Sequence, residues 1–303
     1  MSAQGSGSKS VKKGIACILL SALGFSLMAV FVRVADMCGN ESLPAVQKAL
    51  FRNFVAAIIA GWAFFSRPSS VRKAAIIPNT VKSWSDLLLR CGFGTIGIFA
   101  NFYAISHIQI GDSMALNRTA PFFTLLMSWL LLGQRMTTRQ MICIGGAFAG
   151  ALFVIKPGYD NMFSVPALVG LFSGIGAGAA YAFLHKLGKA GIDSAFIILF
   201  FSVFSCVACI PFLFWGFVSM SLLQIAVLLI AGACAAVGQF GITWGYKFAE
   251  PREVSIYDYM GIIFGAVLGF GAFGEIPDFI SILGFVIIIG MGLLLHFRHK
   301  LVR

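Results

Sequence analysis

Two ionisable side chains inside long apolar runs, Arg118 and Asp258, carry the strongest chemical signal in the chain. A charge at the centre of a lipid bilayer costs at least ~2.5–3.5 kcal/mol on insertion scales, so each of them needs a reason to be there. A guanidinium can hold a carboxylate or another anion. A carboxylate can hold an amino group or a proton. The alternative is a structural ion pair in which the two side chains neutralise one another.

Other polar side chains within apolar runs could line a path for a polar molecule. Asn117 is the positional equivalent of Asp258 at a fixed offset of 141 residues. Tyr257, Asp258 and Tyr259 are consecutive, and on an α-helix they point about 100° apart, so only one or two of them can face one cavity. Either tyrosine could stack on a planar or cationic group. The remaining candidates are Asn101, Tyr103, Arg52, Tyr181, Gln239 and Trp244.

Several of these residues also have a simpler explanation. Trp and Tyr near the end of a spanning helix are commonly interfacial, which applies to Trp244. Arg90 lies five residues into its helix, and we expect its long side chain to reach the aqueous phase on the cytoplasmic side. Arg52 lies deeper in its apolar run, and lining a cavity and static packing remain equal alternatives for it.

No catalytic or cofactor motif accompanies these residues. The sequence contains no Walker loop, no H-E-x-x-H and no G-x-S-x-G. Cys206 and Cys209 form a C-x-x-C pair, but it lies in an apolar run without a second ligand pair, so we expect buried thiols rather than a metal site. We therefore expect no enzyme, no cofactor and no metal.

Long apolar segments must position the polar side chains. Of the 303 residues, 59% are hydrophobic and only 11% are charged, which is typical of a polytopic membrane protein. About 20 apolar residues cross ~30 Å of hydrocarbon as a helix. The sequence therefore predicts an all-α fold with ten transmembrane helices. These begin near Gly14, Val46, Ser85, Asp112, Arg139, Ser164, Ser194, Leu222, Val254 and Phe279.

The net charge of +11 is explained by topology rather than by nucleic acid, which we do not expect as a partner. Basic residues concentrate in alternate loops, such as residues 67–73 and 135–139. The opposite loops hold only Lys156, with Arg33 and Lys48 at the membrane edge. The positive-inside rule then places both termini in the cytoplasm. The prediction is an integral, multi-pass protein of the plasma (inner) membrane.

One motif occurs twice. Residues 111–135 (GDSMALNRTAPFFTLLMSWLLLGQR) align with residues 252–276 (REVSIYDYMGIIFGAVLGFGAFGEI), so that Phe123 falls on Phe264 and Gly133 on Gly274. Five spans per half is an odd number, so the halves enter the membrane from opposite faces as inverted repeats. This symmetry should bring Arg118 and Asp258 together near the midplane. The expected units are tails at 1–13 and 298–303 and repeats at 14–157 and 164–297.

Residues 119–124 (TAPFFT) and 129–137 (WLLLGQRMT) resemble the EamA repeat of the drug/metabolite transporter superfamily, in which an apolar run ends in Gly-Glu-Arg before a Gly-rich helix. The resemblance covers residues 14–297. Gln134 stands in place of the usual Glu. Ile262 stands where the first repeat has Pro121, so the second copy should kink less. The Tyr257–Asp258–Tyr259 run resembles the subgroup that includes S-adenosylmethionine carriers.

The resemblance implies two inverted five-helix repeats and alternating access through a cavity lined by the third, fourth, eighth and ninth spans. We expect a secondary active transporter of a small polar, zwitterionic metabolite, such as an amino acid or S-adenosylmethionine. Arg118 would hold its carboxylate and Asp258 its amino group or a proton. One alternative is an organic-anion (di- or tricarboxylate) carrier, favoured if Arg52 joins Arg118 in the cavity and Asp258 is protonated. Another is a membrane receptor or scaffold in which Arg118 and Asp258 stay locked together.

The expected partners are the small-molecule substrate and the lipid bilayer. Coupling to a proton or to a counter-substrate remains open, as do import against export and a monomer against a homodimer.

Overall fold

The computed structural model describes residues 3–39, 42–68, 77–132, 137–155, 164–248 and 255–297. In this part of the chain all regular structure is helical. The helices of the first half are α1 (Ala3–Met37), α2 (Ala45–Phe65), α4 (Val81–His107), α5 (Ile110–Asn117), α6 (Ala120–Leu132) and α7 (Thr138–Ile155). Those of the second half are α8 (Val165–Lys189), α9 (Ser194–Gly216), α10 (Leu222–Phe248), the 3₁₀ helix η1 (Ser255–Tyr259), α12 (Met260–Phe273) and α13 (Phe279–Phe297).

Helix length and composition agree with an integral membrane protein. Among the described residues, six helices are long and apolar enough to cross a membrane, namely α1, α2, α4, α8, α9 and α10. The shorter helices α7 and α13, the divided segment α5–α6 and the continuous segment η1–α12 complete the ten predicted spans. Large apolar side chains such as Trp62, Phe214 and Phe279 are exposed on the bundle, where lipid is the solvent that fits them.

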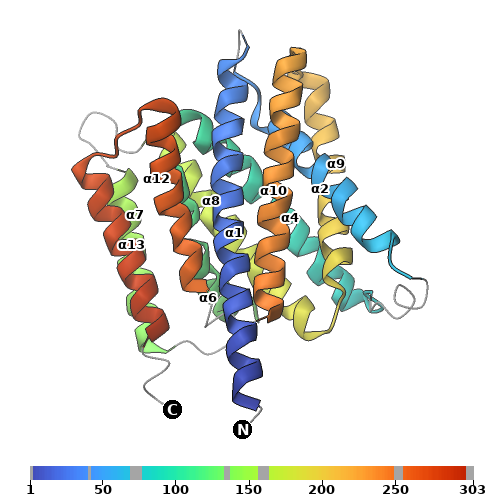
Figure 1. The fold of residues 1–303 in the computed structure, drawn as a ribbon, viewed down its shortest axis with the longest axis vertical. Coiled ribbons are helices and arrows are strands. Elements are labelled where there is room, and N and C mark those ends of the chain that lie inside the picture. The colour runs from blue at the N-terminus through green and yellow to red at the C-terminus, as the bar shows by residue number, and fades with distance from the viewer. Residues whose placement is uncertain are drawn as a thin grey trace.

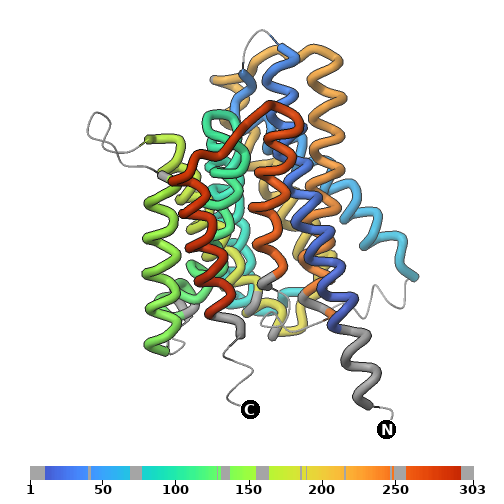
Figure 2. Tube along the Cα trace, turned by 60° about the vertical axis from the view of Figure 1, so that its left-hand side comes forward, coloured from blue at the N-terminus to red at the C-terminus, as the bar shows by residue number. Residues whose placement is uncertain are grey.

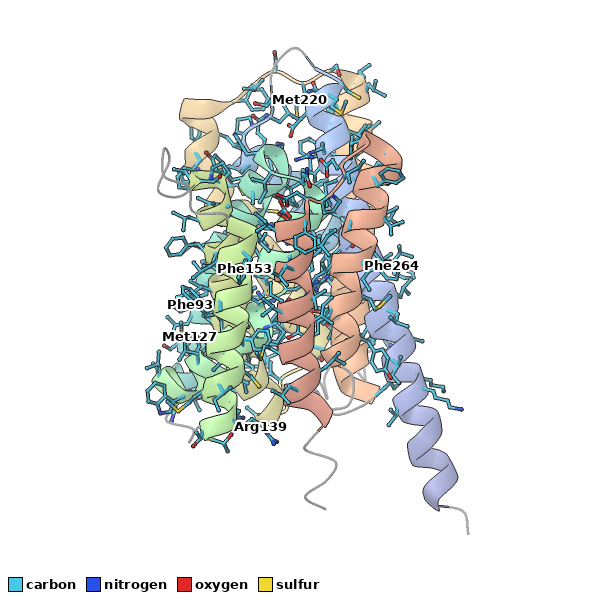
Figure 3. The ribbon with its side chains drawn as sticks, turned by 90° about the vertical axis from the view of Figure 1, so that its left-hand side faces the viewer. Phe93, Met127, Arg139, Phe153, Met220 and Phe264 are labelled. Atoms are coloured by element: carbon cyan, nitrogen blue, oxygen red, sulfur yellow. The ribbon has the colours of Figure 1, made fainter. Side chains whose placement is uncertain are left out.

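The two halves are inverted repeats. The beginning of α1 and the end of α13 lie at the same end of the bundle (Figures 1 and 2), as an even number of spans requires. Arg139 of α7 lies toward this end and Met220 at the opposite end (Figure 3). Helix α1 packs along α10, and the corresponding helices of the other half, α8 and α4, pack along each other.

Glycine contacts confirm this symmetry at the level of single residues. A Cβ atom at Gly24 would lie 2.9 Å from the backbone nitrogen of Gly238, so α1 and α10 touch through their backbones. A Cβ at Gly176 would lie 2.9 Å from the Cα of Gly97, and α8 touches α4 in the same way. Gly97 and Gly238 are related by the offset of 141 that aligns the repeated motifs. Small residues at such crossings allow the close approach on which packing in lipid depends.

The fourth span of the first repeat is broken where its polar residues lie. Helix α5 ends at Asn117, Arg118 and Thr119 form a turn, and α6 begins at Ala120. Pro121 stands in the first turn of α6, where its missing N–H group costs no helical hydrogen bond. The sequence predicted one continuous helix from Asp112, so this interruption is a correction.

The equivalent span of the second repeat runs without interruption from η1 into α12. This agrees with the expectation from Ile262, which replaces the proline. The polar run of the second repeat nevertheless departs from α-helical geometry, because Tyr257, Asp258 and Tyr259 lie in the tighter 3₁₀ turn. Both repeats therefore place their key polar residue outside regular α-helix, as transporters do around substrate sites.

Candidate functional site

A polar cavity lies inside the bundle, lined by residues of α1, α2, α4, α5, α8, α9 and α10 and by Arg118. The cavity volume is about 80 Å³, which is room for a few water molecules. It is small beside pockets of ~300–1,000 Å³ that hold drug-sized ligands. The expected lining by the third, fourth and eighth spans is present, whereas no described residue of the ninth span lines the cavity. The polar residues of the wall are Arg52, Arg90, Arg118, Asn101, Asn117, Tyr181 and Gln239.

Arg118 and Asp258 form a buried ion pair between the repeats. Nη1 of Arg118 lies 2.6 Å from Oδ2 of Asp258, and each residue is only 5% exposed. The juxtaposition predicted from the inverted symmetry is therefore present. Arg118 Nε and Asp258 Oδ1 have no hydrogen-bond partner among the described residues, so neither group is fully satisfied by the other. A buried polar atom without a hydrogen-bond partner costs free energy.

A glycine makes room for the guanidinium of Arg118. A Cβ atom at Gly261 would lie 2.6 Å from both Nε and Nη2 of Arg118. Gly261 belongs to the first turn of α12, directly after the turn that carries Asp258. The same segment therefore supplies both the carboxylate and the space for its partner.

Arg90 corrects the expectation that its side chain reaches the aqueous phase. It is only 3% exposed, it lines the cavity, and its Nε and Nη1 atoms have no hydrogen-bond partner among the described residues. Its guanidinium carbon lies 3.7 Å from the centre of the Phe201 ring of α9. The side chain passes Gly94, one turn further along α4, where a Cβ would be 2.8 Å from Nη1. Gly94 and Phe201 thus favour the inward orientation.

Arg52 also belongs to the cavity wall and is 8% exposed. Its Nη1 donates to Oδ1 of the neighbouring Asn53 at 3.0 Å, and Asn53 in turn donates to the carbonyl of Ala49. No carboxylate of the described residues forms a salt bridge with Arg52 or Arg90. The cavity therefore holds more positive than negative charge.

Four neutral side chains complete the polar wall. Asn117 donates to the Ser173 hydroxyl at 2.9 Å, whereas Oδ1 of Asn101 is buried and lacks a hydrogen-bond partner among the described residues. Gln239 reaches the wall from α10. Tyr181 of α8 interacts electrostatically with all four charged groups, Arg52, Arg90, Arg118 and Asp258. The phenol therefore lies near both the ion pair and the two other arginines.

Five of the expected site residues do not line the cavity, and one of them is Asp258, which is paired with Arg118. Tyr259 is buried near Phe122, with ring centres 6.1 Å apart, and Tyr257 packs beside the cluster of Ile18 and Ile242. Tyr103 stacks on His107 at the end of α4, with ring centres 4.2 Å apart. Trp244 is 51% exposed, which agrees with the interfacial explanation for it.

Comparisons with known proteins agree with this architecture. Residues 12–156 match the EamA-like transporter family. The chain is 28% identical over 280 residues to the pseudopaline exporter CntI of Pseudomonas aeruginosa, covering 92% of this chain and 94% of the exporter. It is 26% identical to a riboflavin transporter of Rhizobium johnstonii, covering 92% and 89% of the two chains.

Two more distant similarities extend the comparison. An S-adenosylmethionine uptake transporter of Rickettsia bellii is 22% identical over 65% of this chain and 67% of its own length. A protein of known crystal structure has the same fold, with a TM-score of 0.59, 13% identity, and coverage of 94% of this chain and 98% of its own. The first half of the chain thus matches the EamA-like transporter family, and these relatives are transporters rather than enzymes, which supports a membrane transporter of a small metabolite.

Proposed function

We propose that the protein is a secondary carrier that moves a small, carboxylate-bearing zwitterion across the membrane by alternating access. One observation carries the proposal: a buried ion pair joins the two repeats, its Arg118 lines the cavity, and both partners have an atom without a hydrogen-bond partner among the described residues. A zwitterion carries both charges, so it could take the place of each partner in the ion pair. Its carboxylate would bind Arg118 and its amino group Asp258.

The ion pair also suggests how binding could be coupled to movement. Arg118 and Asp258 hold the broken fourth span of one repeat against η1 of the other. A substrate that binds both groups would separate them and widen a cavity that now has room for only a few waters. The repeats could then rock around the substrate and expose it to the other side, as inverted-repeat carriers do.

A second candidate is a carrier of organic anions with two or three carboxylates. It is favoured by the presence of Arg52 and Arg90 beside Arg118 in the cavity wall. In this case the arginines would hold the substrate without a contribution from Asp258. The two candidates differ in whether the substrate needs an amino group.

The charge distribution of the loops supports an inner-membrane location with both termini in the cytoplasm. Relatives named for pseudopaline, riboflavin and S-adenosylmethionine support small metabolites in general, with export and uptake both represented. They do not select between the two candidates.

Uptake into proteoliposomes tests the proposal directly. The panel comprises neutral and acidic amino acids, S-adenosylmethionine, succinate and citrate, each radiolabelled. We expect uptake of at least one zwitterion, and a decrease of about tenfold or more in Arg118→Ala and Asp258→Asn, since a charge-assisted hydrogen bond contributes ~1.5–3 kcal/mol. Arg139→Gln, at the start of α7, is the matched control and should retain the wild-type rate. Uptake of the anions alone would favour the second candidate, and normal uptake in both cavity variants would exclude this site.

A further inference from the structure

Arg52 and Arg90 are two buried cations in the wall of the same cavity, and no described carboxylate forms a salt bridge with either. They come from α2 and α4, whereas the Arg118–Asp258 pair comes from the fourth spans of the two repeats. Two like charges at such depth repel one another, and each has lost its water. A pair of this kind is stabilised by an anion that lies between or beside the two groups.

The contacts of Arg90 show which part of its guanidinium group remains open to a ligand. The Phe201 ring covers one face of the guanidinium at 3.7 Å, so the face is occupied by an aromatic contact. The N–H groups along the edge remain, and both Nε and Nη1 are buried without a hydrogen-bond partner among the described residues. These are the donors with which arginine binds the oxygens of carboxylates and phosphates.

We infer that Arg52 and Arg90 form a second anionic subsite, which binds an oxyanion of the substrate separate from the carboxylate held by Arg118. The inference rests on the proposed function and narrows its substrate class to zwitterions with an additional carboxylate or phosphate. Tyr181 lines the same cavity and lies within electrostatic range of both arginines and of the Arg118–Asp258 pair. Asn101 Oδ1, another unsatisfied atom in the wall, can accept a hydrogen bond from an N–H or O–H group of the same substrate.

Matched pairs of compounds test the subsite. L-Glutamate and L-glutamine are nearly isosteric and differ in one carboxylate, and O-phospho-L-serine and L-serine differ in one phosphate. Uptake of each compound is measured in proteoliposomes containing wild-type protein, Arg90→Gln, Arg90→Lys or Arg139→Gln. We expect the wild type and Arg139→Gln to prefer the acidic member of at least one pair by about tenfold or more, which corresponds to ~1.4 kcal/mol. The pair that shows the preference identifies carboxylate or phosphate as the bound group.

Arg90→Gln should abolish this preference, because the acidic compound loses its counter-charge, while uptake of the neutral compound continues through Arg118 and Asp258. Arg90→Lys keeps the charge but not the planar donor edge, and it should retain part of the preference. Gly94→Ala should lower the preference as well, because its Cβ would collide with Nη1 of Arg90 at 2.8 Å. Gly92→Ala is its control, since a Cβ there meets no atom within 4 Å.

The outcomes separate the two ideas. A wild-type protein that moves acidic and neutral partners equally, or an Arg90→Gln variant that keeps the full preference, overturns the second subsite and leaves the proposed function intact. A wild-type protein that moves no compound of either pair or of the broader panel overturns both. If Arg90→Gln does not elute as a folded protein in size-exclusion chromatography, Arg52→Gln is measured in its place with the same expected loss of preference.

Discussion

Arg118 and Asp258 lie 140 residues apart in the sequence, yet their side chains meet at 2.6 Å inside the bundle. Each belongs to the fourth span of its repeat, and each lies outside regular α-helix, Arg118 at the break after α5 and Asp258 in a 3₁₀ turn. The pair therefore joins the repeats at the point where both spans depart from regular α-helix. A change at either residue should affect stability as well as transport.

Removal of one partner should destabilise the protein more than removal of both. A single loss leaves an uncompensated buried charge, which typically costs about 3–5 kcal/mol, whereas apolar replacement of a whole buried pair is often nearly neutral. We expect Arg118→Met and Asp258→Leu each to lower the melting temperature in detergent, and the double variant to recover much of the loss. A double variant whose loss equals the sum of the single losses would show that the two residues are not coupled.

Gly261→Ala should displace the guanidinium of Arg118 without removing any charge. The added Cβ would lie 2.6 Å from Nε and Nη2, so the guanidinium must move away from its present place beside Asp258. We expect transport to fall about tenfold or more, in line with the loss of one charge-assisted hydrogen bond. Gly271→Ala on the same helix has no atom within 4 Å of its Cβ and should transport normally. Equal rates in the two variants would contradict the role of Gly261.

The sequence was sufficient to predict the ion pair because the offset between the two motifs relates whole helices. It was not sufficient to predict which of three consecutive polar residues faces the centre. In the 3₁₀ turn Tyr257, Asp258 and Tyr259 point about 120° apart, rather than the 100° of an α-helix. Asp258 meets Arg118, while the two tyrosines pack in apolar clusters on either side. The turn type depends on tertiary contacts that a single sequence does not reveal.

Arg90 shows a second limit of sequence reasoning. A lysine or arginine five residues into a spanning helix usually extends toward the nearer interface. Here the opposite orientation is stabilised by Phe201, which belongs to a helix more than a hundred residues later in the chain. The nearby sequence indicates the inward orientation of the Arg90 side chain only through Gly94, four residues later. A glycine at this spacing also occurs where helices simply pack closely. Fold and symmetry follow from patterns along the chain, whereas side-chain orientation in the cavity depends on neighbours from other helices.

The symmetry of the two glycine contacts leads to a paired prediction. Gly176→Ala should push α8 away from α4, and Gly24→Ala should push α1 away from α10. In each case the added Cβ would lie 2.9 Å from a backbone atom of the facing helix. Overpacking of this kind typically costs ~1–3 kcal/mol. We expect similar decreases in melting temperature for the two variants. Gly188→Ala, on α8 with no atom within 4 Å of its Cβ, should be neutral or slightly stabilising. A large decrease in only one of the paired variants would contradict equivalent packing in the two repeats.

Arg33 and Glu275 form a polar lock at the end of the bundle away from the termini. Arg33 of α1 forms a salt bridge with Glu275, which follows α12, and donates to the carbonyl of Ile105 at 2.6 Å. The second oxygen of Glu275 accepts from the backbone N–H of Ile110, the first residue of α5, at 2.8 Å. Four segments are thus held together by two side chains. A second ion pair, which provides the control variant below, joins α4 to α8. In it Nζ of Lys186 lies 2.7 Å from Oδ1 of Asp86.

Glu275→Gln should loosen this lock, because the amide keeps the shape of the carboxylate but loses the charge that holds Arg33. The chain itself has a glutamine, Gln134, at the equivalent place of the first repeat, although that residue lies outside the described part of the structure. The measurement is the labelling rate of Asn117→Cys in a background without other cysteines. An impermeant maleimide is added from the side of the membrane opposite the two termini. We expect faster labelling in Glu275→Gln and no increase in Asp86→Asn, since Asp86 lies near the start of α4 and α4 reaches the Arg33–Glu275 lock with its opposite end. Equal labelling in Glu275→Gln and the parent protein would mean that Arg33 and Glu275 do not control access to the cavity from that side.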